Sequence, residues 1–100
     1  MATAATELDP LRKRVLIRGT LFSSQGTHVI WIRDISPSGA LVSSQDPLPA
    51  YGDVALKRGG MFVAARVVSS TEGGAELEFY RELKVAEINS ATVAASQHHD

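Results

Sequence analysis

The chain has 100 residues, a formal net charge of −1 and no cysteine. This length fits one small domain with one modest core and excludes a second domain. The absence of cysteine excludes a disulfide framework, a cysteine-ligated zinc and a thiol nucleophile. Ten Lys plus Arg are balanced by eleven Asp plus Glu, which argues against a protein that binds long nucleic acid through its phosphates. A bound anion would need a local cluster of cations.

The hydropathy pattern predicts no membrane span. The longest uncharged run, residues 19–32, contains Ser, Gln, Thr and His and is shorter than the ~20 apolar residues of a membrane helix. Residues 1–6 lack the basic start and the apolar stretch of a secretory signal. We therefore expect a cytoplasmic protein with a flexible lead-in over residues 1–11, one domain over 12–90 and a disordered tail over 91–100.

The middle of the chain predicts six β-strands. Runs rich in β-branched and aromatic residues alternate with short segments rich in Gly, Ser and Asp, a pattern typical of strands joined by turns. The segments around Gly26 and over 58–60 predict hairpin turns, and the two prolines within 46–49 predict an irregular connector. The expected strands cover 15–22, 28–33, 40–43, 53–57, 61–68 and 75–80.

A short helix is expected after the last strand. The run over residues 81–88 lacks Gly and Pro and places Leu83, Ala86 and Ile88 near one helical stripe. Six short strands favour a closed barrel, because closure removes exposed strand edges. The predicted fold is all-β: a six-stranded antiparallel β-barrel with a short C-terminal α-helix. Trp31, which lies within an apolar run, is expected in the core or in a wall covered by the helix.

Two polar clusters are candidates for a binding site. The first contains Arg12, Lys13, Arg14 and Arg18, and the second contains Asp34, Ser36 and Gly39. Arg14 and Arg18 are separated by an even number of residues, so in an extended chain their side chains point to the same side. Pairing of the first two strands places Asp34 beside Arg14. The hairpin should therefore bring the two clusters together.

These residue types suit a ligand that contains guanine and phosphate. The guanidinium group binds phosphate or the O6 and N7 edge of guanine with two hydrogen bonds, and its flat face stacks on a base. The Asp34 carboxylate would accept hydrogen bonds from the guanine N1 and N2 donors. Ser36 offers a short hydroxyl, and Gly39 permits either a close backbone approach or a positive φ.

The same residues carry a resemblance to a known family. Arg14-Val-Leu-Ile-Arg18 matches Arg-x-x-x-Arg, and Asp34-Ile-Ser36-Pro-Ser-Gly39 matches Asp/Asn-x-Ser-x-x-Gly; in this order, these are the two signatures of PilZ domains. The likeness runs from about Arg12 to Tyr80. It implies a PilZ-like barrel of bacterial origin that acts as a receptor for cyclic di-GMP, without a cofactor and without enzymatic activity, and that signals to a downstream protein partner. The implied ligand contacts are Arg14, Arg18, Asp34, Ser36 and Gly39, with Arg12 as a further candidate.

Three other interpretations compete with this one. Residues 15–17 have the composition of a strand, whereas in PilZ domains the arginine motif usually precedes the first strand. The alternative is therefore a degenerate PilZ domain that binds no nucleotide and acts as an adaptor between proteins.

A small barrel that binds single-stranded nucleic acid is disfavoured by the negative net charge and the few aromatic residues. His28, Asp34 and Ser36 are the residue types of a hydrolase triad, but no nucleophile elbow surrounds Ser36, and no metal site is expected at His98-His99-Asp100.

Overall fold

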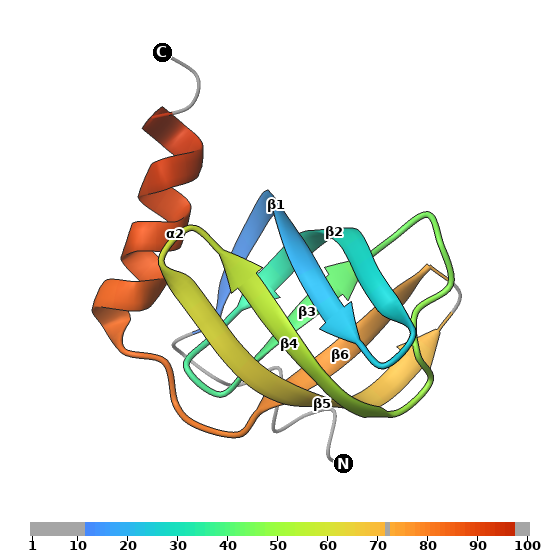
Figure 1. Cartoon of the computed structure of the whole chain (residues 1–100). Coiled ribbons are helices and arrows are strands. Elements are labelled where there is room, and N and C mark those ends of the chain that lie inside the picture. The colour runs from blue at the N-terminus through green and yellow to red at the C-terminus, as the bar shows by residue number, and fades with distance from the viewer. Residues whose placement is uncertain (1–11, 72, 98–100) are drawn as a thin grey trace.

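The protein is a closed barrel of antiparallel strands with a helix at one end (Figure 1). The computed structural model describes residues 12–71 and 73–97. Their elements are β1 (Lys13–Ser23), β2 (Gly26–Ile35), β3 (Gly39–Ser43), β4 (Gly52–Arg58), β5 (Met61–Thr71), β6 (Gly74–Phe79) and α2 (Val85–Gln97). The strand order is β1-β2-β3-β6-β5-β4, and β4 pairs with β1 to close the barrel. The predicted six-stranded antiparallel barrel with a C-terminal helix is confirmed.

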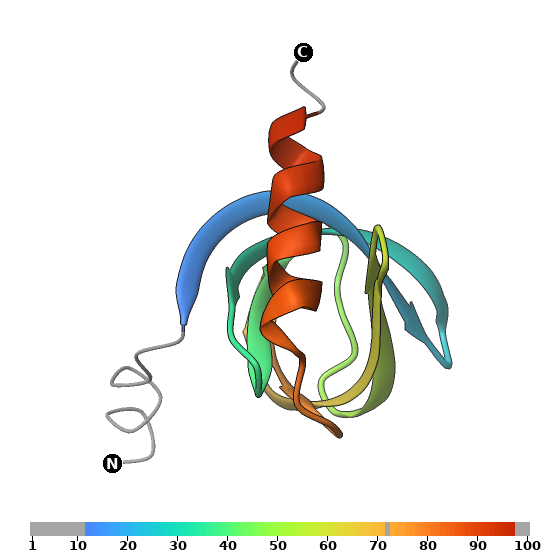
Figure 2. The same cartoon turned by 90° about the vertical axis from the view of Figure 1, so that its left-hand side faces the viewer.

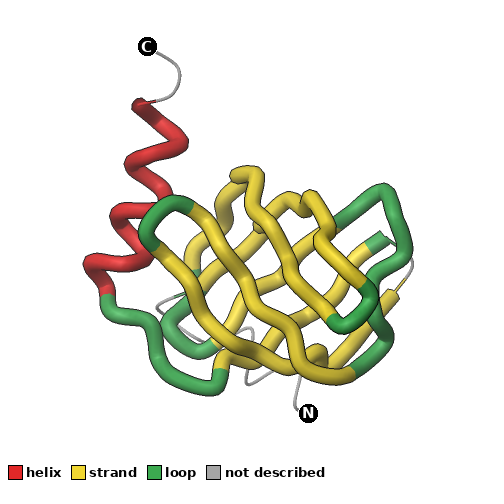
Figure 3. The backbone as a smooth tube through the Cα atoms, viewed as in Figure 1, coloured by secondary structure: helices red, strands yellow, loops and turns green. Residues whose placement is uncertain are grey.

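The connections follow the turn residues of the sequence (Figure 3). Gly26 follows the turn between β1 and β2 with φ 126°, and Gly59 lies in the turn between β4 and β5 with φ 57°. Only glycine adopts such positive φ values without a steric cost. The segment that contains both prolines connects β3 to β4 without a strand of its own, because proline has no amide hydrogen to donate to a ladder.

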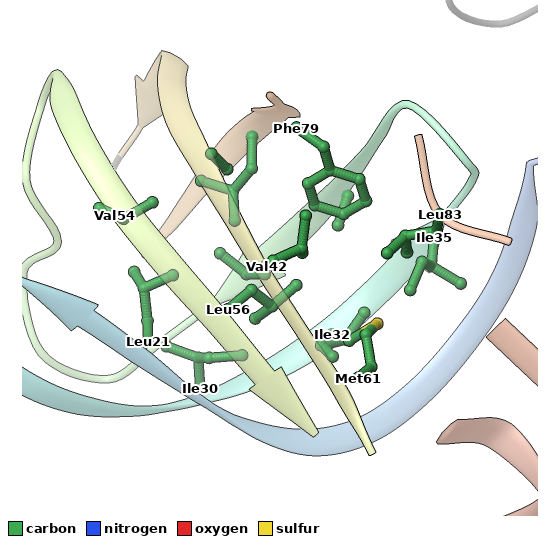
Figure 4. Packing of buried hydrophobic residues seen from close by; sticks show 14 of the residues in the cluster. Leu21, Ile30, Ile32, Ile35, Val42, Val54, Leu56, Met61, Phe79 and Leu83 are labelled. Atoms are coloured by element: carbon green, nitrogen blue, oxygen red, sulfur yellow. The ribbon is translucent and has the colours of Figure 1, made fainter. Parts of the chain in front are cut away.

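Alternation along the strands fills the barrel with aliphatic side chains (Figure 4). Leu21, Ile30, Ile32 and Leu56 are completely buried, and removing such apolar surface from water is the main stabilising term of a small domain. Trp31 is 40% exposed, so the expectation that it lies in the core is wrong. Its two neighbours in β2 point inward, and the period of two therefore directs its side chain outward.

The helix begins later and ends later than the sequence pattern predicted. Residues 81–84 form a connector, because the Leu83 amide donates to the carbonyl of Pro37 at 2.9 Å and its side chain is buried. The tail predicted over residues 91–100 is helical as far as Gln97. The predicted lead-in, residues 1–11, and residues 98–100 lie outside the described residues.

The first turn of α2 is stabilised by reciprocal hydrogen bonds. The Glu87 carboxylate accepts from the amide of Lys84 at 2.9 Å, which is one of the two bonds of a capping box, and the Lys84 carbonyl accepts from the amide of Glu87 at 2.9 Å. Arg81 donates to both oxygens of Glu87, at 3.0 and 2.9 Å. These hydrogen bonds, that of Arg81 above all, lower the pKa of Glu87 to about 2.

The helix packs beside β1 and β5 and projects past the barrel (Figure 2). Ile88 and Ala91 are buried, and Lys13 Nζ donates to Asn89 Oδ1 at 3.3 Å. This contact ties the start of β1 to the helix. In the described part of the chain no helix has the length and apolarity that crossing a bilayer requires.

Candidate functional site

A groove of about 450 Å³ lies where β1, β2 and β3 meet the turn between β5 and β6. Its polar lining includes Arg14, Arg33, Asp34 and Ser43, and Gly73 and Gly74 form its wall on the side of the turn. Guanidinium groups and a carboxylate therefore share one concave surface.

Strand pairing brings Arg14 and Asp34 together as predicted. They are direct partners in the register of β1 and β2, and Asp34 is in turn opposite Leu41 of β3. Side chains of directly paired residues lie on the same face of a sheet, close enough to interact. Because the next residue of β2, Ile35, is completely buried, this face is the outer surface of the barrel.

Arg33 is a groove residue that the sequence reasoning missed. In a regular strand, adjacent residues point to opposite faces, so Arg33 and Asp34 would not line one surface. The register between β2 and β3 shifts between Ile32 and Asp34, and Arg33 has no partner in either neighbouring strand. A bulge of this kind redirects a side chain, and no feature of the sequence marks its position.

The groove carries more positive than negative charge. Arg12 Nε lies 3.7 Å from Asp34 Oδ2, and the two side chains are 19% and 18% exposed. This distance is too long for a hydrogen bond, so Arg12 leaves the acceptor sites of the Asp34 carboxylate unoccupied. Among the described residues, no carboxylate forms an ion pair with Arg14 or Arg33.

Ser36 lies in the turn between β2 and β3 and Gly39 begins β3, and neither residue lines the groove. Ser36 is 1% exposed, and its hydroxyl accepts from the amides of Ser38 and Gly39 at 3.3 and 3.2 Å. Gly39 is also buried and does not have a positive φ. A Cβ built on Gly39 would overlap the carbonyl oxygen of Leu77. The two residues thus hold the turn against β6, and we omit them from the proposed ligand contacts.

Arg18 lies on the outer face of β1 but belongs to a different pocket from Arg14. Its partner in the register is Trp31, and the Arg18 guanidinium carbon is 5.4 Å from the centroid of the indole ring. This is the geometry of a cation–π contact. The expectation that both arginines point to one side holds, but they do not share the groove.

The remaining polar clusters are satisfied internally. The His28 ring shares a hydrogen bond with the Ser23 hydroxyl at 3.0 Å, far along the strand from the turn that holds Ser36. On the other side of the barrel the hydroxyl of Tyr80 donates to Asp53, which raises the pKa of Tyr80. Within residues 12–71 and 73–97 no three His, Asp or Glu side chains gather as a metal site would require. His98-His99-Asp100, where no metal site was expected, lies outside these ranges.

Comparisons with known proteins give no family assignment. No family model and no curated protein matches the chain. The crystal structure of an uncharacterised Legionella protein is similar to it, with 22% sequence identity over 89% of this chain and 94% of that chain and a TM-score of 0.47. A likeness at this level indicates neither family nor function.

Proposed function

We propose that this protein is a PilZ-like receptor domain without enzymatic activity that binds cyclic di-GMP in the groove on β1, β2 and β3. The observation that supports it best is the direct pairing of Arg14 with Asp34 inside that groove, with Arg33 beside them. In the proposal the domain works in the bacterial cytoplasm and passes the signal to a protein partner.

The chemistry of the lining suits the two parts of this ligand. Arg14 and Arg33 carry guanidinium forks that match a phosphate or the O6 and N7 edge of guanine. Asp34 is an acceptor for the N1 and N2 donors of the same base. The volume of about 450 Å³ lies in the range of roughly 300 to 1,000 Å³ common for small-molecule sites.

The ion pair of Arg12 with Asp34 suggests how binding changes the surface. In the proposal, a guanine that hydrogen-bonds to the free acceptor sites of Asp34 competes for this carboxylate with Arg12, whose Nε lies 3.7 Å from it. The released guanidinium then turns to a phosphate of the ligand. The charge-assisted hydrogen bond that it forms there is stronger than its contact with Asp34, which is too long for a hydrogen bond. Arg12 immediately precedes β1, so in the proposal this exchange repositions the start of β1, and the partner reads the new surface.

Titration calorimetry with cyclic di-GMP tests the proposal. Arg14→Ala and Asp34→Asn should each weaken binding roughly fivefold to 150-fold, because one bidentate base contact contributes about 1–3 kcal/mol. Lys84→Met, on an exposed residue outside the groove, is the control and should bind as the wild type does. Absence of heat at high micromolar ligand with folded wild-type protein would eliminate the receptor function.

Arg18→Ala tests the position of the site in the same titration. Since Arg18 does not line the groove, this variant should bind within about twofold of the wild type, a difference of a few tenths of a kcal/mol. If Arg18→Ala abolished binding and Arg14→Ala did not, the ligand would occupy another surface.

Exposed apolar side chains favour the adaptor as a second candidate function. Leu16 of β1 is 64% exposed, and Val29 and Trp31 of β2 are 63% and 40% exposed. Interface cores are enriched in aromatic residues and arginine, and Trp31 already packs against Arg18. A melting temperature that does not respond to cyclic di-GMP, together with a protein partner captured by the wild type and lost with Trp31→Ala, would select this function.

A further inference from the structure

A second pocket, of about 370 Å³, lies between β1 and β4 beside the turn to β5. The ladder between these two strands includes Thr20 paired with Lys57 and does not reach Arg58 or Arg18. Beyond this pair no strand pairing joins β1 to β4, and the lining of the pocket there includes Arg18, Lys57 and Arg58. Three cations therefore line one pocket at the point where the pairing of β1 with β4 ends.

Arg58 lies at the seam between β1 and β4, where their pairing ends, and does not use all of its N–H groups as hydrogen-bond donors. Its Nη1 donates to the Arg18 carbonyl at 3.2 Å, where a strand partner is missing. Its Nε is buried and has no hydrogen-bond partner among the described residues. Leaving a buried donor unsatisfied is costly, and for a charged group the cost is greater. Arg58 also lines the pocket, so a phosphate oxygen bound there would be an acceptor for the donors that Arg58 leaves unused.

The positive charge of the pocket is not neutralised locally. No Asp or Glu lines it, and the ion pairs among the described residues involve other cations. Arg18 is held by its stacking on Trp31, which reduces the conformational entropy lost when it binds an anion. Side chains that are fixed in advance and lack a counter-charge are the features of an anion site.

We propose that this pocket binds the phosphate group of a small organic phosphate. Three cations favour an anion with more than one charge, and a phosphate monoester carries about −1.5 to −2 at pH 7 with three strong acceptor oxygens, whereas a carboxylate carries one. Guanidinium groups bind such oxygens in pairs. Gly59 lines the pocket, and a Cβ on it would contact nothing within 4 Å, so the organic part of the ligand meets no obstacle on this side.

The site is independent of the proposed function. It shares no lining residue with the groove that contains Arg14 and Asp34. Loss of one site should therefore leave the other intact, and the two proposals fail separately.

A nuclear magnetic resonance titration of the full chain with glycerol 3-phosphate tests the proposal. The Arg58 Nε–Hε signal and the amide signals of Gly59 and Gly60 should shift and saturate. Lys57→Met removes one exposed cation without disturbing a packed residue and should weaken binding about fivefold or more, whereas the matched control Lys84→Met should not. Arg14→Ala should leave this titration unchanged.

Three results would overturn the proposal. The first is the absence of a saturable shift at Arg58 in folded wild-type protein. The second is equal weakening by Lys57→Met and Lys84→Met, which would indicate general charge attraction. The third is saturation by inorganic phosphate in a parallel titration without saturation by glycerol 3-phosphate, which would exclude the organic phosphate.

Discussion

The Gly39→Ala substitution tests whether the motif glycine serves the fold. Gly39 begins β3 and pairs with Glu78 of β6. A Cβ at this position would approach the carbonyl oxygen of Leu77 far inside 3.0 Å, a separation that real Cβ atoms essentially never show. The obstacle is backbone in a paired strand, so it cannot turn away as a flexible side chain would. β3 and β6 must therefore move apart.

The expected cost follows from this overlap. Forcing extra volume into a packed site costs about 1–3 kcal/mol, and in a domain of this size each kcal/mol lowers Tm by roughly 4–8 °C. Gly39→Ala should therefore lower Tm by about 4 to 24 °C. Gly60→Ala is the matched control, because its Cβ meets nothing within 4 Å; its Tm should be unchanged or slightly raised, since alanine restricts the unfolded chain.

Thermal unfolding followed by circular dichroism measures both variants. A Gly39→Ala protein that melts as the wild type does would refute the close approach of β3 and β6. Separation of β3 and β6 would also distort the groove, which residues of both strands line, so weaker binding of cyclic di-GMP by a destabilised Gly39→Ala protein would not by itself mark Gly39 as a ligand contact. A stable Gly39→Ala protein without binding would instead return Gly39 to the ligand contacts.

Three further predictions concern stability. Ile32→Ala empties a completely buried site and should cost about 2–5 kcal/mol in urea unfolding; a cost below this range would indicate that the core collapses around the gap. The ion pair of Arg66 with Glu78 has side chains 57% and 55% exposed, so Glu78→Gln should change stability by less than about 1 kcal/mol, and a larger loss would contradict a solvent-screened pair. Because hydrogen bonds, first that of Arg81, lower the pKa of Glu87 from 4.5 to about 2, its stabilising contribution is complete above pH 4.5 and is lost as the pH falls toward 2. Thermal melts of the wild type and of Glu87→Gln should therefore differ at pH 7 and converge near pH 2, and a constant difference would contradict this.

The barrel could be predicted because its signals are local. The period of two in segments such as 75–80 follows from strand geometry alone, and turn glycines such as Gly26 and Gly59 mark the places where the chain must reverse. The start of α2 was mispredicted for a tertiary reason: the amide of Leu83 donates to Pro37 of a distant turn, and this competes with the helical pattern.

The candidate site was predictable only in part. Arg14 and Asp34 meet because a hairpin must bring its two ends together, which the order of the strands already implies. Arg33 and Arg18 could not be placed in the same way. A bulge in β2 directs Arg33 into the groove, and the stacking on Trp31 together with the seam between β1 and β4 assigns Arg18 to another pocket.

The sequence by itself thus determined the strand count, the main turns and the pairing of Arg14 with Asp34, because these follow from strand periodicity, turn residues and the return of a hairpin on itself. The tertiary structure alone decided the bulges, the burial of Ser36 and Gly39 against β6, and the division of the arginines between two pockets. These features depend on contacts between strands far apart in the chain, and no local pattern of side chains encodes the distance between two such strands.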